Sequence, residues 1–308
     1  MWDGLLSKRH KLHTKAALLK AKRLKMNNST TKRLLGKNLI LPILIWTGII
    51  VVFLNVKHIP YDFTGKNNLV LRYFVKFLVT IVFPLLLIHL LYKNKGDFGI
   101  YFPKFLGSFK LSLRAYMICG PAGVTFLLIA IFGWGFDDWY GSITLSIVYL
   151  LVFYFVPKIT KRLPTRVAII APNKRIIVFV VFSLLTVVIA YFTYAYVPVI
   201  SKILYYLFIV GLGEELLFRG YMQSAFNRYF GKPFSIGNVK FGWGLFLSAL
   251  LFGLMHALVV APPLWPWALF TFVIGLTLGY IREKDGSILS AVLLHALFDM
   301  PLVFFSVT

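Results

Sequence analysis

Residues 205–222 read YYLFIVGLGEELLFRGYM, and this stretch places two adjacent carboxylates, Glu214 and Glu215, inside an otherwise apolar run. An ionised side chain at the centre of a membrane helix costs about 2.5–3.5 kcal/mol on insertion scales. Such residues usually face a bundle interior or a water-filled cavity, so the pair predicts a functional site. The alternative is a structural ion pair with Arg219, one helical turn after Glu215, and this is the interpretation we favour for Glu215.

Composition places the whole chain in the membrane. Of its 308 residues, 59% are hydrophobic and 17% aromatic, with a mean hydropathy of +0.81. Soluble domains are usually about 45–50% apolar and about 25% charged. Long apolar runs favour helices over a β-barrel, whose strands would show short alternating segments. The single cysteine, Cys119, excludes an intrachain disulfide and is expected to be a core thiol.

The net charge of +23 is concentrated at the amino terminus, where 11 Lys and Arg fall within residues 1–38 against Asp3 alone. This segment has a basic amphipathic pattern, which predicts binding to an anionic cytoplasmic leaflet; a solvated positive tail fits equally well. Nucleic acid is not an expected partner. Because 38 polar and basic residues precede the first apolar run, a cleavable signal peptide is not expected either.

The chain is predicted to be an all-α, polytopic transmembrane helical bundle of about eight or nine spans. Short loops poor in cations, at 136–141 and 261–266, alternate with loops rich in Lys and Arg, which places the amino terminus in the cytoplasm. We expect a basic segment at 1–38, amino-terminal transmembrane helices at 39–198 and a four-helix catalytic core at 199–308. The apolar spans lie near 39–56, 77–92, 115–134, 142–157, 176–198, 202–222, 242–261, 266–281 and 287–305.

Few ionisable side chains fall deep within these spans: His89, Glu214, Glu215, Arg219, His256, His295 and Asp299. Residues four apart share a helix face, so Glu215 meets Arg219 and His295 meets Asp299, while Glu214 points about 100° away from its neighbour. Phe252 stands one turn before His256 and is expected to wall its side of the site. His89 is expected to have a packing role. One carboxylate and two imidazoles around a buried cavity suit the activation of water for hydrolysis.

Three short motifs carry a resemblance to a known family. EELLFR at 214–219, FGLMH at 252–256 and HALFD at 295–299 resemble the EExxxR, FxxxH and HxxxN/D motifs of the CAAX protease and bacteriocin-processing family. The resemblance covers about residues 200–305. It implies a four-helix core and a glutamate-dependent intramembrane endopeptidase without a cofactor. Glu214 would be the general base, aided by His256. His295 and Asp299 would form the pair that stabilises the oxyanion.

The resemblance also implies that Glu215 and Arg219 are structural or shape the site. Asp299 departs from the eukaryotic pattern, which has Asn there, and an ionised Asp cannot donate to an oxyanion. It must therefore be protonated, orient His295, or ligate a metal.

Three rival functions stay open. A zinc metalloprotease would use Glu214, His256, His295 and Asp299 as ligands, although HExxH is absent. The others are a non-catalytic bacteriocin-immunity or scaffold protein and a proton-coupled transporter. The expected partners are the lipid bilayer and a membrane-associated peptide or protein substrate. The expected location is a prokaryotic plasma membrane.

Overall fold

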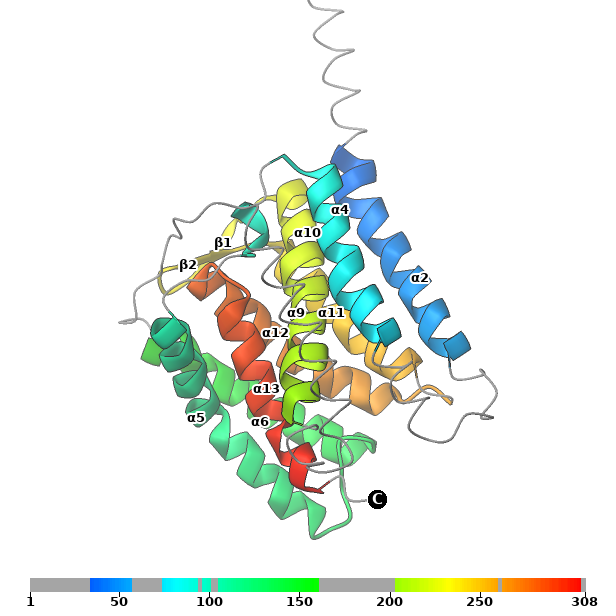
Figure 1. The fold of residues 1–308 in the computed structure, drawn as a ribbon. Helices are drawn as coiled ribbons and strands as arrows, with labels where there is room; N and C mark the ends of the chain where they lie inside the picture. The colour runs from blue at the N-terminus through cyan, green and yellow to red at the C-terminus, as the bar shows by residue number, and fades with distance from the viewer. Residues whose placement is uncertain are drawn as a thin grey trace, which may run out of the picture.

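The structure is a computed structural model that describes residues 34–56, 74–93, 96–100, 105–160, 203–259 and 262–305. Most of the basic amino-terminal segment and the predicted span at 176–198 lie outside the described residues. Within the described part, the chain is almost entirely helical, which confirms the helical class (Figure 1). The β1–β2 hairpin is the exception to the predicted all-α fold.

The helices and strands follow one another along the chain with these bounds: η1 Gly36–Ile40, α2 Leu41–Val56, η2 Leu78–Val82, α4 Phe83–Leu91, η3 Gly96–Phe98, α5 Phe105–Ala130, α6 Trp139–Thr160, η4 Tyr205–Gly211, α9 Leu212–Glu215, η5 Leu216–Met222, α10 Gln223–Phe230, β1 Phe234–Ile236, β2 Val239–Phe241, α11 Trp243–Leu258, α12 Trp265–Asp285 and α13 Leu289–Phe305.

In the described part of the chain, four helices are long and apolar enough to cross a membrane: Gly36–Asn55, Phe74–Leu91, Phe105–Ala130 and Trp139–Thr160. Many large apolar side chains on these helices are exposed, as expected of surfaces that face lipid. The protein is therefore an integral membrane protein. Trp243–Leu258 and Leu289–Met300 are shorter apolar helices.

One predicted span starts within three residues of the observed helix, and the boundary of another was wrong. The second span starts at Phe74 rather than 77, so it contains Lys76, whose long aliphatic stem can be buried while its ammonium finds a partner. The helix α5 starts at Phe105, so Lys110 and Arg114 lie on it rather than in a loop at 93–114.

The chain from Tyr205 to Phe230 forms one continuous helical path that lies centrally in the bundle (Figure 1). It contacts α11 through α10 and η5, and α13 through η4 and α9. The helix formed by η2 and α4 packs against α9 and η5, while α5 and α6 contact α12 and α13. The described residues of the predicted core at 199–308 comprise this central path, the β1–β2 hairpin, α11, α12 and α13.

The two glutamates occupy a single α-helical turn, α9, between two π-helical segments, η4 and η5. π-helical geometry is rare and is frequently found at functional sites, because it changes the direction in which successive side chains point. Gly213 in this turn lies against η2: a Cβ added there would be 2.3 Å from the Thr80 hydroxyl oxygen. Close packing at Gly213 therefore brings the helix that carries Lys76 against the glutamate turn.

Candidate active site

Glu215 is completely buried and joins two motifs. Its Oε1 accepts hydrogen bonds from Arg219 at 3.0 Å and from Nδ1 of His295 at 2.8 Å. The bond to Arg219 is the one-turn ion pair that the spacing predicts. The bond to His295 was not predicted, because it joins two segments 80 positions apart in the chain. Glu215 therefore links the central helix to α13 and fixes one nitrogen of the His295 ring.

Arg219 is also fully buried, and its guanidinium is held on several sides. It donates to the Gly275 carbonyl on α12 at 3.2 Å and lies 4.3 Å from the centre of the Phe252 ring. An added Cβ at Gly275 would come within 3.2 Å of the guanidinium, so a glycine permits this contact. Burying an Arg–Glu pair is tolerated when additional hydrogen bonds support it. Here the Gly275 carbonyl and His295 supply two such bonds, whereas Nε of Arg219 and Oε2 of Glu215 have no hydrogen-bond partner among the described residues.

Glu214 points to a different side of the central helix. Its Oε1 accepts a hydrogen bond from Lys76 at 2.8 Å, and its Oε2 lies 3.9 Å from Nε2 of His256. No donor in the described part of the chain reaches Oε2, although this atom is buried. Glu214 thus contacts Lys76 and His256, whereas the hydrogen bond of His295 goes to Glu215.

The hydrogen bonding of His256 fixes its tautomer. Its Nδ1 lies 2.8 Å from the Phe252 carbonyl oxygen, which can only accept, so Nδ1 carries the proton when the ring is neutral. Nε2 is then left as an acceptor, directed towards Glu214. The centres of the Phe252 and Trp267 rings lie 4.5 and 5.3 Å from the centre of the imidazole, so Phe252 packs beside His256.

His295 and Asp299 lie one turn apart on α13, with Nε2 and Oδ2 separated by 3.6 Å. This distance is longer than a hydrogen bond, so Nε2 is directed at the carboxylate without being fully engaged by it. Phe252 again lies alongside, with its ring centre 5.8 Å from that of His295. His89, by contrast, is exposed near the end of α4.

Lys76 is the residue that sequence reasoning missed. It was excluded because the predicted span began at residue 77, one position after it. The available signal was a lone cation, Lys76, followed immediately by the apolar run FLVTIVFPLLLI. A cation at the end of a span usually reaches the interface, so this signal alone does not identify a buried partner.

The zinc alternative would need Glu214, His256, His295 and Asp299 to gather around one ion. Within the described ranges, no group of three or more His, Cys, Asp or Glu is placed so that it could hold a metal ion. The reason is visible in the pairing: Glu215 takes one nitrogen of His295, and Lys76 takes one oxygen of Glu214.

Ionisable side chains paired in the interior of a helical membrane bundle mark a functional site. Residues 196–301 match the sequence model of a family described as Rce1-like, type II CAAX prenyl endopeptidase. This match confirms the resemblance that the three motifs indicate, and it supports peptidase activity at the level of the family. No curated protein and no solved structure matches the chain.

Proposed function

We propose that this protein is an intramembrane endopeptidase in which Glu214 and His256 activate a water molecule for attack on a peptide bond. The observation that carries the proposal is the unpartnered, buried Oε2 of Glu214 facing the acceptor nitrogen of His256 at 3.9 Å. A water between these two acceptors can donate one hydrogen to each, which directs an oxygen lone pair towards a substrate carbonyl. Glu214 then takes the proton as the water attacks.

The second carboxylate–imidazole pair supplies the oxyanion contact. His295 has a carboxylate near each ring nitrogen, and it can donate to both only as an imidazolium. Glu215 holds Nδ1 and so orients the ring, while the looser contact at 3.6 Å leaves Nε2–H able to turn to a developing oxyanion. Among the three roles considered for Asp299, orienting His295 therefore fits best.

Lys76 orients Glu214, the proposed base. Its ammonium engages Oε1 of Glu214, which leaves Oε2 for water and fixes the carboxylate plane. The side chains of Lys76 and His256 are 20% and 17% exposed, so this side of the cluster is the one that substrate and water can approach. We propose that the substrate is a membrane-associated peptide or protein, and that the chain lies in a prokaryotic plasma membrane with its amino terminus in the cytoplasm.

The direct test compares membranes that contain the wild-type protein with membranes that contain Glu214→Gln. New peptide termini identified by mass spectrometry should appear with the wild type and be absent with Glu214→Gln and with His256→Ala. Glu283→Gln is the matched control, because Glu283 is a third buried glutamate outside the three motifs, and it should leave cleavage intact. Equal cleavage by wild type and Glu214→Gln would refute the mechanism.

The same preparation separates the rival functions. If a chelator abolishes cleavage and zinc restores it, a metal-dependent mechanism is correct instead. Proton uptake driven by a substrate in proteoliposomes, without peptide cleavage, would indicate a transporter. A wild-type protein that generates no new termini, yet still protects cells from a bacteriocin as Glu214→Gln does, would indicate the non-catalytic role.

A further inference from the structure

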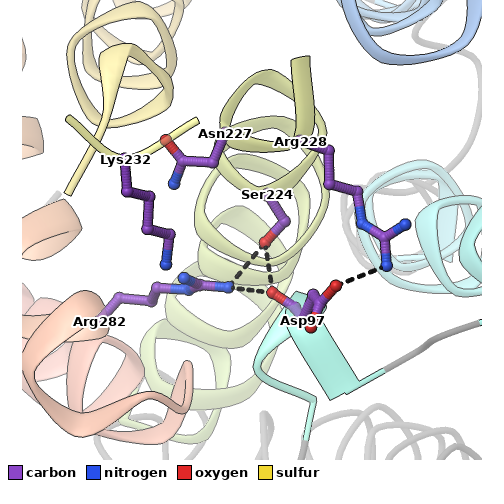
Figure 2. A pocket seen from close by; sticks show the side chains of 6 residues that line it. All are labelled: Asp97, Ser224, Asn227, Arg228, Lys232 and Arg282. Carbon is purple, nitrogen blue, oxygen red and sulfur yellow. Dashed lines mark hydrogen bonds and ion pairs between the residues drawn. The ribbon is translucent and has the colours of Figure 1, made fainter. Parts of the chain in front are cut away.

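A second polar cluster lies at one end of the bundle, where α10, the end of α12 and η3 meet. It encloses a cavity of about 220 Å³, and Figure 2 shows the six side chains that line it: Asp97, Ser224, Asn227, Arg228, Lys232 and Arg282. None of these residues belongs to the three motifs or contributes to the proposed mechanism. Ser224 follows Glu214 by ten residues on the same helical path, which separates the two sites by about 15 Å along the axis.

The charges around the cavity do not cancel. Its lining contributes three cations, Arg228, Lys232 and Arg282, and one carboxylate, Asp97. Glu283 lies behind the lining and accepts bonds from Lys232 at 2.6 Å and from Arg282 at 2.9 Å. Three positive and two negative charges leave one net positive charge among these residues. The cavity is therefore suited to an anion.

Two of the three cations are held in place before any ligand binds. One terminal nitrogen of Arg282 donates at 2.7 Å both to the Asp97 carbonyl and to the Ser224 hydroxyl. The guanidinium of Arg228 lies 5.1 and 5.0 Å from the Tyr92 and Phe98 ring centres. Fixed donors lower the entropy cost of binding an anion.

The third cation, Lys232, is the adjustable one. Its side chain is 40% exposed, and its ammonium has three hydrogens, of which Glu283 uses one. Figure 2 shows Lys232 and Arg228 on opposite sides of the central Ser224, with Arg282 and Asp97 below them; Asp97 forms an ion pair with Arg228 at 2.8 Å. This arrangement matches an oxyanion with several acceptor oxygens.

The position of the cavity places it at a membrane boundary. The apolar run of α12 ends at Ile281 and is followed at once by the polar residues 282–285. The apolar helix α4 ends at Leu91, six residues before Asp97. Phe230, at the end of α10, keeps a 41% exposed ring beside this polar cluster. Basic pockets between membrane helices at this level commonly bind lipid head groups.

We propose that this cavity binds the phosphate group of an anionic membrane lipid. Its volume of about 220 Å³ is below the usual range of about 300–1,000 Å³ for drug-sized ligands, and so suits a small head group. A lipid whose head group also carries a quaternary ammonium should bind more weakly, because the three cations of the cavity repel that charge. Inorganic phosphate offers the same oxygens without the acyl chains, and the membrane-boundary position favours the lipid.

The test measures thermal unfolding of the purified full chain in detergent micelles as phosphatidylglycerol, phosphatidylcholine or inorganic phosphate is added. A ligand that binds the folded state raises the unfolding temperature, and the stabilisation grows with the logarithm of the ratio of ligand concentration to Kd. Phosphatidylglycerol should stabilise the protein, and phosphatidylcholine at equal concentration should do so much less. If inorganic phosphate stabilises as well as phosphatidylglycerol, the lipid assignment is wrong.

Three variants make the test specific to the cavity. Lys232→Gln keeps a donor for Glu283 but removes a cation, and it should weaken phosphatidylglycerol binding by about three- to tenfold. Asp97→Asn removes the carboxylate of the lining and should strengthen binding by about two- to fivefold. Lys240→Gln is the matched control, because Lys240 is exposed on β2 and outside the lining.

Opposite effects of Lys232→Gln and Asp97→Asn, with Lys240→Gln unchanged, are the expected result. Equal weakening by Lys232→Gln and Lys240→Gln would show a diffuse attraction between a basic surface and anionic lipid, and would overturn the proposal. A weaker or unchanged affinity in Asp97→Asn would overturn it too. The measurement reports lipid binding alone, so its outcome does not depend on whether the protein cleaves peptides.

Discussion

The Lys76–Glu214 pair predicts strong coupling between two residues that lie 138 positions apart in the chain. The perturbation is a double-mutant cycle of Lys76→Met, Glu214→Met and the combined variant. Methionine is unbranched and flexible, so it can fill either position without a charge. Each single variant leaves one buried ionisable group without its partner, whereas the combined variant leaves none.

The magnitude follows from the burial of the two side chains. Breaking a fully buried ion pair by removing one partner costs about 3–5 kcal/mol, whereas replacing both partners with apolar residues is often nearly neutral. Glu214 is 5% exposed but Lys76 is 20% exposed, so part of the loss is recovered through water. We therefore expect each single variant to lose about 2–3 kcal/mol of unfolding free energy and the coupling to exceed about 2 kcal/mol.

The assay is reversible unfolding in mixed micelles with increasing dodecyl sulfate, followed by far-ultraviolet circular dichroism. The control cycle combines Glu214→Met with Lys158→Met, because Lys158 packs on the Tyr154 ring of α6 and not on Glu214. The control costs should add. If the Lys76 and Glu214 costs also add, within about 0.5 kcal/mol, the ion pair does not form and the proposed role of Lys76 is wrong.

Three further predictions test other parts of the structure. Gly213→Ala should destabilise the protein by about 1–3 kcal/mol, because the added carbon meets the Thr80 hydroxyl. Gly123→Ala is the control, because its added carbon meets nothing within 4 Å and should not destabilise the protein. Thermal unfolding measures both variants, and equal effects would contradict the close packing at Gly213. Burial favours the neutral acid of Glu283, but two neighbouring cations outweigh it and hold its pKa below the ordinary value, so its stabilisation is present at neutral pH and lost as the pH falls through the acidic range. Glu283→Gln should therefore flatten the loss of stability on acidification, and an unchanged pH dependence would refute this. Asp299→Asn should keep the cleavage rate within about tenfold of wild type, because an amide oxygen can still orient His295, while Asp299→Ala should lose more activity. Initial cleavage rates measure both variants. An equal loss in both would assign the carboxylate a direct role.

Much of the fold follows from the sequence because hydropathy is a strong signal over a span of 20 residues. The apolar runs near 39–56 and 142–157 correspond to helices whose two ends lie within a few residues of the predicted bounds. The β1–β2 hairpin was not predicted, because three-residue strands are too short to show alternation. The π-helical segments on either side of α9 also have no simple sequence signature.

The candidate site was predictable where its contacts are local. The pairs Glu215–Arg219 and His295–Asp299 are each one helical turn apart, so periodicity finds them. The contacts of Glu214 with Lys76 and of Glu215 with His295 join distant segments, and they depend on how helices are rotated against one another. Helical periodicity fixes which residues share a face, but it does not fix which neighbouring helix that face meets.

The structure gives the two adjacent glutamates different contacts. On consecutive positions of a helix their side chains diverge by about 100°, so each meets different neighbouring helices. Glu215 is fully buried and has two donors on Oε1, which suits it to orient Arg219 and His295. Glu214 keeps one oxygen engaged by Lys76 and the other facing His256, which leaves a proton acceptor in a defined position. A chain that needs one fixed orienting carboxylate and one available base can therefore encode both in a single dipeptide, provided that a different helix meets each face.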